Sequence, residues 1–346
     1  MSPSPRRPMD RRLGHLIGAY GLLALAALLF LAFSLALPDT FPTLDNISEV
    51  LSNQSIPAVL ALGATIPIVT AKFDLSLGYG LGLAHVMTMQ LIANEEWPWP
   101  LACLVVVLGG AVVGTFNGVV VEFAKIDSFI ATLGTGSILY AVTGWITNGA
   151  RIIPGPHGLP AAFTDLYDSR FLGLPVSAFY VLALTAVLWL LLERLPLGRY
   201  LYVIGSNPRA ADLVGIPTRR YVIYAFVGSG LVVGVAGVLL AAQQRIGNPS
   251  VGLDYLLPAF VGALLGSTAI KPGRPNALGT LVAVVVLAIG LTGIGQLGAQ
   301  FWITPLFNGT TLLLSVGMAG YAARRQLRQR RAEPPRPLPD LPEATP

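Results

Sequence analysis

Ten apolar segments, separated by polar connections, follow one another along the chain. A helix needs about 17 to 25 apolar residues to cross a hydrocarbon core of roughly 30 Å, and most of the segments reach that length. They cover residues 13–37, 56–71, 77–93, 101–123, 129–147, 176–192, 221–242, 255–265, 277–294 and 301–321, and the segment 255–265 is the shortest. The pattern predicts an all-α integral membrane protein with about ten transmembrane helices.

The overall composition agrees with a membrane location. Hydrophobic residues make up 54% of the 346 residues and charged residues only 11%, whereas soluble domains contain about 25% charged residues. The first apolar segment, 13–37, is too long for a removable signal peptide and has no small-residue cleavage site, so it is interpreted as a signal anchor.

The distribution of basic residues predicts the orientation, because Lys and Arg accumulate at the cytoplasmic ends of spans. With ten spans and a cytoplasmic N-terminus, 19 of the 22 Lys and Arg residues fall inside, and the exceptions are Arg151, Arg170 and Arg245. The prediction is a basic cytoplasmic segment 1–12, a transmembrane domain 13–321 with a cytoplasmic loop 194–220, and a disordered basic, Pro-rich cytoplasmic tail 322–346. The net charge of +5 is therefore mostly membrane-orienting, and nucleic-acid binding is not expected.

Residues for redox, metal or covalent chemistry are few. One cysteine, Cys103, excludes an intramolecular disulfide, and His15, His85 and His157 lie far apart without a metal-ligand spacing. An intramembrane enzyme would need a convergent acid, base or nucleophile cluster, which the sequence does not show. No catalytic residue, metal site or bound cofactor is therefore predicted.

The polar stretch "GRYLYVIGSNPRAADLVGIPTRR", residues 198–220, has the features of a short helix. Asn207 is suited to the N-cap, Pro208 to the first helical position and Gly215 to the position after the helix. Because such a short helix is unstable alone in water, something must pack on it. Ala210, Leu213 and Val214 fall on one face as a small apolar stripe. Either the helix folds back onto its own bundle or the lipid surface, or this stripe sits in a cleft of a moving partner.

The same stretch carries a family resemblance that extends along the chain. "GRYLYVIGSNPRAADLVGI" resembles the cytoplasmic loop of permeases of ribose-type sugar ATP-binding-cassette (ABC) importers, which have the pattern G-x-N-x-x-A-A-x-x-x-G-I. "FIATLGT", "FDLSLG" and "ALGTLVAVVVLAIGLTGIGQLG" resemble other characteristic stretches of that family, in the same order, from about residue 44 to 321. The chain is thereby identified as similar to these permeases over nearly its whole length.

The resemblance implies a membrane-spanning permease of the bacterial inner membrane that transports a sugar. Its implied partners are a second permease copy, expected as a homodimer, two cytoplasmic ATPase subunits that use ATP and Mg²⁺, and a periplasmic sugar-binding protein. The loop 194–220 would hold the coupling helix, with contact candidates Asn207, Ala210, Ala211, Leu213, Gly215 and Ile216. The chain lacks the G-x-x-x-x-G-K-[ST] motif, so it is not expected to hydrolyse ATP itself.

Two sites depart from the family pattern. Ala71 and Lys72 stand where the family usually has two glycines, which allow close helix approach or positive φ. Asp127 and Ser128 stand where proline or small apolar residues are common. Both sites lie near the family's transport path, so the usual pentose cargo is not a secure expectation for this chain.

Several polar residues within or between apolar segments are candidates for the transport path: Asp74, Ser76, Asn117, Thr132, Thr135 and Ser137. Asp74 either binds cargo or locks a gate, paired with Lys72, or it caps the next helix at the cytoplasmic surface with support from Ser76. The hydroxyl and amide side chains either line a sugar path or bond neighbouring helices. Glycines three or four residues apart, at 110 and 114 and at 230 and 234, predict close helix packing.

The prediction is thus a non-enzymatic permease for a monosaccharide or similar polyhydroxylated solute. A permease for amino acids or nucleosides is the near alternative. An ion-coupled secondary transporter is a more distant one, because it would need carboxylates at the membrane midplane, and Glu122, Asp127 and Glu193 lie near cytoplasmic ends. The outer connection 148–175 is either a lid or docking surface or a tie between helices.

Overall fold

The computed structural model describes residues 8–314 and residue 317, with side chains from residue 20 onward. Residues 1–7 of the expected basic N-terminal segment lie outside this part, as does the whole tail expected at 322–346. The described backbone is helical apart from its connections and one antiparallel hairpin, in which β1 (Arg170–Phe171) pairs with β2 (Leu174–Pro175). The all-α fold class is confirmed.

The described helices include one for each of the ten apolar segments of the sequence and three that were not predicted, Leu44–Asn53, Ala161–Asp168 and Pro196–Ser206. In chain order they are α1 (Pro8–Ala36), α2 (Leu44–Asn53), α3 (Ser55–Val69), α4 (Ser76–Met89) with the π-turn η1 (Gln90–Asn94), α5 (Trp99–Phe123), α6 (Ser128–Thr147), α7 (Ala161–Asp168), α8 (Val176–Trp189) with the π-turn η2 (Leu190–Arg194), α9 (Pro196–Ser206), α10 (Pro208–Leu213), α11 (Thr218–Gln244), α12 (Gly252–Gly266) and α13 (Ala277–Gln296). A further apolar helix, Ile303–Leu314, covers the described part of the last predicted span.

Not all of these helices can cross a bilayer by themselves. Five are long and apolar enough, and the bent pair of α2 and α3, which meet at 43°, makes a sixth if it counts as one span. Among the shorter helices, α12 has 15 residues, or about 22 Å, which is less than a hydrocarbon core. An integral membrane protein is therefore supported, and the number of ten spans stays a prediction.

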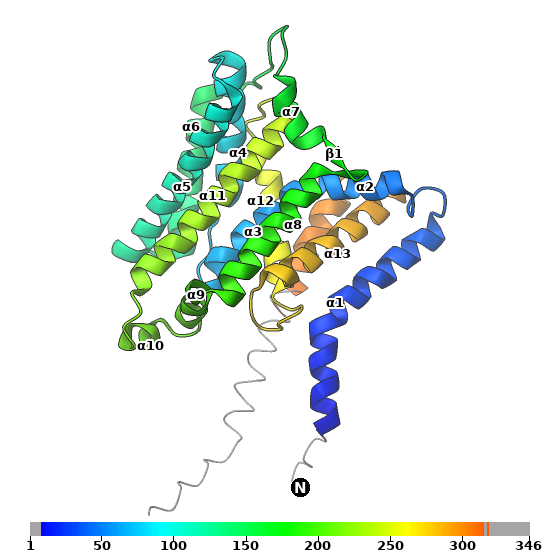
Figure 1. Ribbon diagram of the computed structural model, residues 1–346, viewed down its shortest axis with the longest axis vertical. Helices are drawn as coiled ribbons and strands as arrows, with labels where there is room; N and C mark the ends of the chain where they lie inside the picture. Colours follow the sequence, from blue (N-terminus) through cyan, green and yellow to red (C-terminus); the bar gives the residue numbers. More distant parts are fainter. Residues whose placement is uncertain (1–7, 315–316, 318–346) are drawn as a thin grey trace, which may run out of the picture.

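The helices form one bundle with distinct ends (Figure 1). At one edge lie α5 and α6, and at the opposite edge α1 lies beside α13. Between them, α11 packs against α5, α4 and α3, and α4 also packs against α6 and α12. The short helices α9 and α10 lie at one end of the bundle, and α7 with the hairpin lies at the other.

Glycines bring α5 and α11 into backbone contact, as their spacing predicted. A Cβ atom on Gly110 would lie 2.2 Å from the carbonyl oxygen of Gly230, and one on Gly114 would lie 2.2 Å from that of Phe226. Real Cβ atoms do not approach oxygen so closely, so only glycine fits at these positions. In lipid, where apolar surface does not drive helices together, such close van der Waals packing holds them.

We expect Gly110→Val to destabilise the bundle and Gly109→Val to be tolerated. The two substitutions have the same effect on helix propensity, but a Cβ on Gly109 meets nothing within 4 Å. Forcing a side chain between α5 and α11 should cost about 1–3 kcal/mol or more. Thermal unfolding of the two purified variants in detergent measures the difference, and equal losses for both would show that the glycine contact is not the cause.

Candidate functional site

The helical path of the chain is interrupted between α3 and α4, and side chains of α6 hold the interruption in place. The amide of Phe73 donates to Ser128 Oγ at 3.2 Å, and the amide of Leu75 donates to Thr132 Oγ1 at 2.8 Å. Thr132 Oγ1 also donates to the carbonyl oxygen of Ser128 at 2.7 Å. Backbone amides freed by the break therefore find acceptors inside the protein, which a bilayer requires.

Both departures from the family pattern lie at this interruption. Ala71 has φ of +57°, in the left-handed region that glycine adopts most easily. Ser128 accepts from Phe73, and Asp127 caps α6 by accepting from the amide of Phe129 at 3.0 Å. Asp127 and Ser128 thus have structural partners of their own, which accounts for their polar side chains.

Asp74 is buried at the centre of a polar cluster that joins three helices. Its carboxylate accepts from the amide of Ser76 at 3.1 Å and from Ser76 Oγ at 2.5 Å. Ser229 Oγ of α11 donates to it at 3.4 Å, and Asn117 Nδ2 of α5 donates at 3.5 Å. Ser229 belongs to this cluster although its lone hydroxyl in an apolar segment carried no sequence signal.

The pairing of Asp74 with Lys72, which one of the two interpretations included, is not formed. Lys72 Nζ lies 3.8 Å from the carboxylate of Glu122, which also binds Lys125 at 3.1 Å. Asp74 instead accepts from the amide and the hydroxyl of Ser76, the first residue of α4. It is not the expected surface N-cap, because the N-cap of α4 is Leu75 and the Asp74 side chain is buried. Its further bonds tie α4 to α5 and α11. Glu122 and its two lysines lie at the end of α5.

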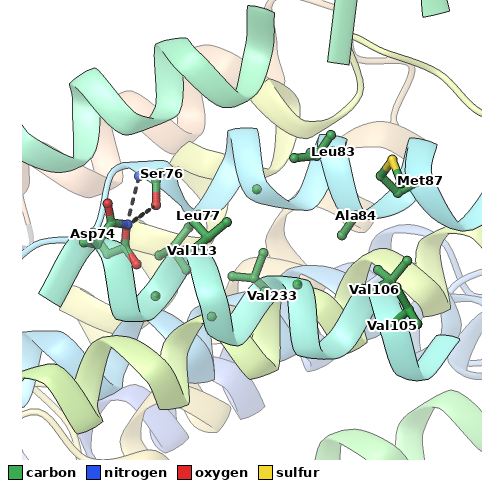
Figure 2. A pocket seen from close by; sticks show the side chains of 16 residues that line it. Asp74, Ser76, Leu77, Leu83, Ala84, Met87, Val105, Val106, Val113 and Val233 are labelled. Atoms are coloured by element: carbon green, nitrogen blue, oxygen red, sulfur yellow. Dashed lines mark hydrogen bonds between the residues drawn. The ribbon is translucent and has the colours of Figure 1, made fainter. Parts of the chain in front are cut away.

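A cavity of about 190 Å³ lies between α4, α5 and α11, with Asp74 and Ser76 at one end (Figure 2). Asn117 also lines the cavity and is bonded to both of these residues. The structure therefore brings three of the six path candidates together. Asn117 donates to Ser76 Oγ at 2.8 Å, and its Oδ1 is buried without a hydrogen-bond partner among the described residues. This oxygen is a free acceptor at the polar end of the cavity.

The other path candidates lie outside this cavity. Thr132 supports the interruption, Thr135 is buried and donates to Ala131 of its own helix at 3.1 Å, and Ser137 is exposed on α6. Beyond its polar end the cavity is lined by apolar side chains such as Leu83, Met87, Val105 and Val233. A hydroxyl-rich solute needs hydrogen-bond partners along its route, so the cavity alone does not form a sugar path.

The loop 194–220, which the sequence predicts to be cytoplasmic, contains two helices, α9 and α10, at one end of the bundle (Figure 1). The predicted caps of α10 are confirmed: Asn207 accepts from the amide of Ala210 at 3.0 Å, Pro208 is the first helical residue and Gly215 has φ of +80°. Thr218 Oγ1, on the first residue of α11, donates to Asp212 at 2.6 Å. The sequence did not predict α9 as a separate helix.

The coupling candidates lie on two different sides of α10. Ala211 is fully buried and Ile216 and Ala210 are half-buried, whereas Leu213 is 88% exposed and Val214 is 73% exposed. Asn207 and Gly215 are exposed at the two ends of the helix. The expected single stripe of Ala210, Leu213 and Val214 is therefore divided, because Leu213 and Val214 point away from the bundle.

Ala211 connects α10 to the transmembrane helices. It belongs to an apolar cluster that combines side chains of five elements: Val121 of α5, Ala131 of α6, Ile204 of α9, Ala211 of α10, and Val222 and Phe226 of α11. Gly205 of α9 packs against the end of α3, where a Cβ on Gly205 would lie 2.0 Å from the carbonyl oxygen of Val69. A displacement of α10 would therefore change the packing of several transmembrane helices at once.

Contacts between α9 and the connection 267–276 complete this end of the bundle. Tyr202 Oη donates to the carbonyl oxygen of Pro275 at 2.6 Å, and the guanidinium of Arg274 lies 3.5 Å from the Tyr202 ring centroid. Lys271 forms an ion pair with Glu193. These tertiary contacts join residues far apart in sequence, and no local pattern pointed to them.

At the opposite end, the connection 148–175 is anchored by α7. Phe163 and Tyr167 are buried, and Tyr167 Oη donates to the carbonyl oxygen of Ser52 at 2.6 Å. Burial raises the pKa of Tyr167, so its hydroxyl stays protonated as a donor. A polar cavity of about 380 Å³ lies beside it, between α2 and α7, and is lined by Glu49, Asp168 and other polar residues. The connection is thus a tie between helices that also presents a polar surface.

Comparison with known proteins gives a consistent assignment. Residues 46–316 match the family described as "Branched-chain amino acid transport system / permease component". The chain is 29% identical to the ribose import permease protein RbsC of Haemophilus influenzae, over 84% of this chain and 89% of that protein. It is 26% identical to the D-allose transport system permease protein AlsC of Escherichia coli, over 86% of this chain and 90% of that protein.

A third relative covers still more of the chain. The autoinducer 2 import system permease protein LsrD of Escherichia coli is 30% identical over 91% of this chain and 98% of its own length. No solved structure matches the chain. Within the part of the chain that the structure describes, no group of three or more His, Cys, Asp and Glu side chains is arranged to hold a metal ion.

We expect Thr132→Val to destabilise the protein and Thr135→Val to have little effect. Both threonines are buried on α6, but Thr132 accepts from the amide of Leu75, whereas Thr135 bonds only its own helix. Leaving a buried amide without an acceptor costs about 1–3 kcal/mol.

The thermal unfolding midpoints of the two variants, measured in detergent, test this expectation. A Thr135→Val variant as unstable as Thr132→Val would contradict it, because the loss would then follow from removing any buried hydroxyl of α6.

Proposed function

Because the chain belongs to the family of branched-chain amino acid transport system permease components, we propose that it is the permease subunit of an ABC importer for a monosaccharide or similar polyhydroxylated solute. The observation that carries the proposal is the similarity over more than four fifths of the chain to permeases named for ribose and D-allose. The chain translocates its solute without making or breaking covalent bonds, and ATP hydrolysis belongs to a partner subunit.

The partners follow from this assignment. Two cytoplasmic ATPase subunits that use ATP and Mg²⁺, a second permease copy and a periplasmic sugar-binding protein complete the importer in the bacterial inner membrane. The ten-span arrangement with both termini in the cytoplasm is part of the proposal. It is supported by the placement of α9, α10 and the pairs of Glu122 and Glu193 with lysines at one end of the bundle.

The contact that we propose for the ATPase consists of two exposed apolar side chains on α10. Leu213 and Val214 form an exposed apolar pair at the end of α10, where a solvated helix would favour polar side chains. Ala211, on the other side of the same helix, is wedged into the cluster shared by α5, α6, α9 and α11. In the proposed mechanism the ATPase binds Leu213 and Val214 and moves α10. Because Ala211 packs against the transmembrane helices, these helices move with α10, and the solute path opens alternately to the two sides of the membrane.

The other coupling candidates have supporting roles in this mechanism. Asn207 and Gly215 fix the two ends of α10, and Ala210 and Ile216 are half-buried beside Ala211. In the membrane, Asp74, Ser76 and Asn117 connect α4, α5 and α11, so they are placed to transmit or lock the movement of these helices. Thr132 fixes the interruption before α4, whereas Thr135 and Ser137 bond only their own helix.

A permease for branched-chain amino acids is the second candidate, because the description of the matching family names that cargo. Uptake of radiolabelled ribose, competed with unlabelled allose or leucine, separates the two candidates. Competition by allose and not by leucine is expected.

We expect Leu213→Glu to abolish copurification with the ATPase and coupled uptake while leaving membrane insertion intact. A charge at this exposed position removes an apolar contact but disturbs no packing within the chain, since the side chain is 88% exposed. Leu172→Glu is the matched control for copurification, because Leu172 is 83% exposed at the hairpin on the opposite end of the bundle.

Mild-detergent purification of both tagged variants, with mass spectrometry of the proteins retained, gives the readout. An ATPase that stays bound at equal stoichiometry to Leu213→Glu would remove the assignment of the coupling contact.

The orientation gives a separate prediction. Single cysteines placed in a Cys103→Ala background at Leu172 and at Leu213 should react with a membrane-impermeant thiol reagent from opposite sides of the membrane. In intact spheroplasts we expect only the Leu172→Cys variant to be labelled, and in inside-out vesicles only Leu213→Cys. Labelling of both from the same side would show that the proposed topology is wrong.

A further inference from the structure

The centre of the membrane-spanning bundle can be located from close contacts between its longest helices. Gly110 is the twelfth of the 25 residues of α5 and touches Gly230, near the middle of α11. One turn further along α11, Val233 touches Gly80, since a Cβ on Gly80 would lie 3.1 Å from Val233 Cγ1. Gly80 of α4 therefore lies at about half the depth of the bundle.

The helix α12 begins at this same depth. A Cβ on Gly252, the first residue of α12, would lie 2.0 Å from the carbonyl oxygen of Gly78 and 2.7 Å from the amide nitrogen of Gly82. Gly78 and Gly82 flank Gly80 on α4. The N-terminus of α12 is thus near the midplane, and not at either surface of the membrane.

The connection that leads to α12, residues 245–251, consequently enters the bundle as non-helical backbone. His85 Nε2 of α4 accepts from the amide of Asn248 at 3.0 Å, and Gly247 pairs with Ile152. On its other side Ser250 is exposed. Non-helical backbone at membrane depth is tolerated where it is buried in protein or lines a water-filled space, so the exposed side of this connection does not suit lipid.

A carboxylate lies on the same exposed side. Asp254 lies two residues after Gly252, in the first turn of α12, and its side chain is exposed. Within the described residues, this side chain forms no hydrogen bond or ion pair. An acidic residue in the first turn stabilises a helix, but this does not remove the cost of placing a charge in hydrocarbon. Ionisable residues at this depth face the bundle interior, a partner or a water-filled cavity.

We propose that the exposed face of α12 around Asp254, together with Ser250, lines the water-filled solute path, and that Asp254 accepts hydrogen bonds from hydroxyl groups of the solute. This proposal rests on the proposed function and identifies the helix face that contacts the transported solute. A carboxylate offers two acceptor oxygens, which suit the adjacent hydroxyls of a neutral polyhydroxylated solute and require no charge on it.

This position differs from the cluster at Asp74. The carboxylate of Asp74 is buried and already accepts from Ser76, Asn117 and Ser229, at the end of a largely apolar cavity. Asp254 is exposed and its acceptor oxygens are available. Cargo recognition and the joining of helices are therefore assigned to two different carboxylates.

The test is thiol accessibility in the assembled importer in native membranes. Asp254→Cys and Ser250→Cys, each made in a Cys103→Ala background, should react with a charged, membrane-impermeant methanethiosulfonate applied to spheroplasts or to inside-out vesicles. Val112→Cys is the matched control, because Val112 is 68% exposed on α5 and lies two residues from Gly110 at the same depth. We expect it to be unreactive from both sides.

Two results would overturn the proposal. One is that Asp254→Cys and Ser250→Cys are present in the membrane at the level of the parent chain and yet react from neither side. The other is oxidative cross-linking of Asp254→Cys between two copies of the chain in place of labelling, because this face would then be an interface between copies.

The role of the carboxylate is tested with Asp254→Asn and ribose as the probe. Asn keeps the size of the side chain but replaces one acceptor oxygen with a donor, so we expect the ribose concentration for half-maximal uptake to rise at least about tenfold. An unchanged value would contradict the role of Asp254. A parent chain that takes up no ribose would instead contradict the choice of sugar in the proposed function, and thiol accessibility would still decide whether α12 lines the path.

Discussion

The structure depends on one constraint, that every backbone amide and carbonyl within a bilayer must find a hydrogen-bond partner inside the protein. Helices meet it locally, and each place where helix is lost needs a specific side chain. Thr132 supplies the acceptor before α4, and His85 does so before α12. At these interruptions the chain does not continue as an unbroken transmembrane helix.

Close packing of glycines follows from the same medium. Because lipid is as apolar as the helix surfaces, the helices associate through backbone approach, as at Gly110 and Gly230 between α5 and α11. The same kind of contact lets α12 start against Gly78 of α4 and lets α9 press on the end of α3. Such contacts hold short and interrupted elements in defined positions relative to the long spans.

This packing also connects α10 mechanically with the polar cluster at Asp74. Ala211 of α10 shares an apolar cluster with α5, α6 and α11, and Ser229 and Asn117 of α11 and α5 reach Asp74 before α4. Along α4, Gly78 contacts the start of α12. Movement of α10 can therefore reach the interior of the bundle through packed elements without any flexible linker.

The sequence by itself determined the membrane class, the apolar helices and the capped helix α10, because apolar length, Asn207, Pro208 and Gly215 are local signals. It did not reveal the short helices α2, α7 and α9. It also placed Asp74, Ser76 and Asn117 among the path candidates, and they do meet in one cavity. Only the tertiary structure decided that Lys72 pairs with Glu122, that Ser229 joins Asp74, and that Leu213 is exposed while Ala211 is buried. The depth of Asp254 was likewise invisible in sequence, because it follows from where Gly252 meets α4, and contacts between distant segments leave no local periodicity.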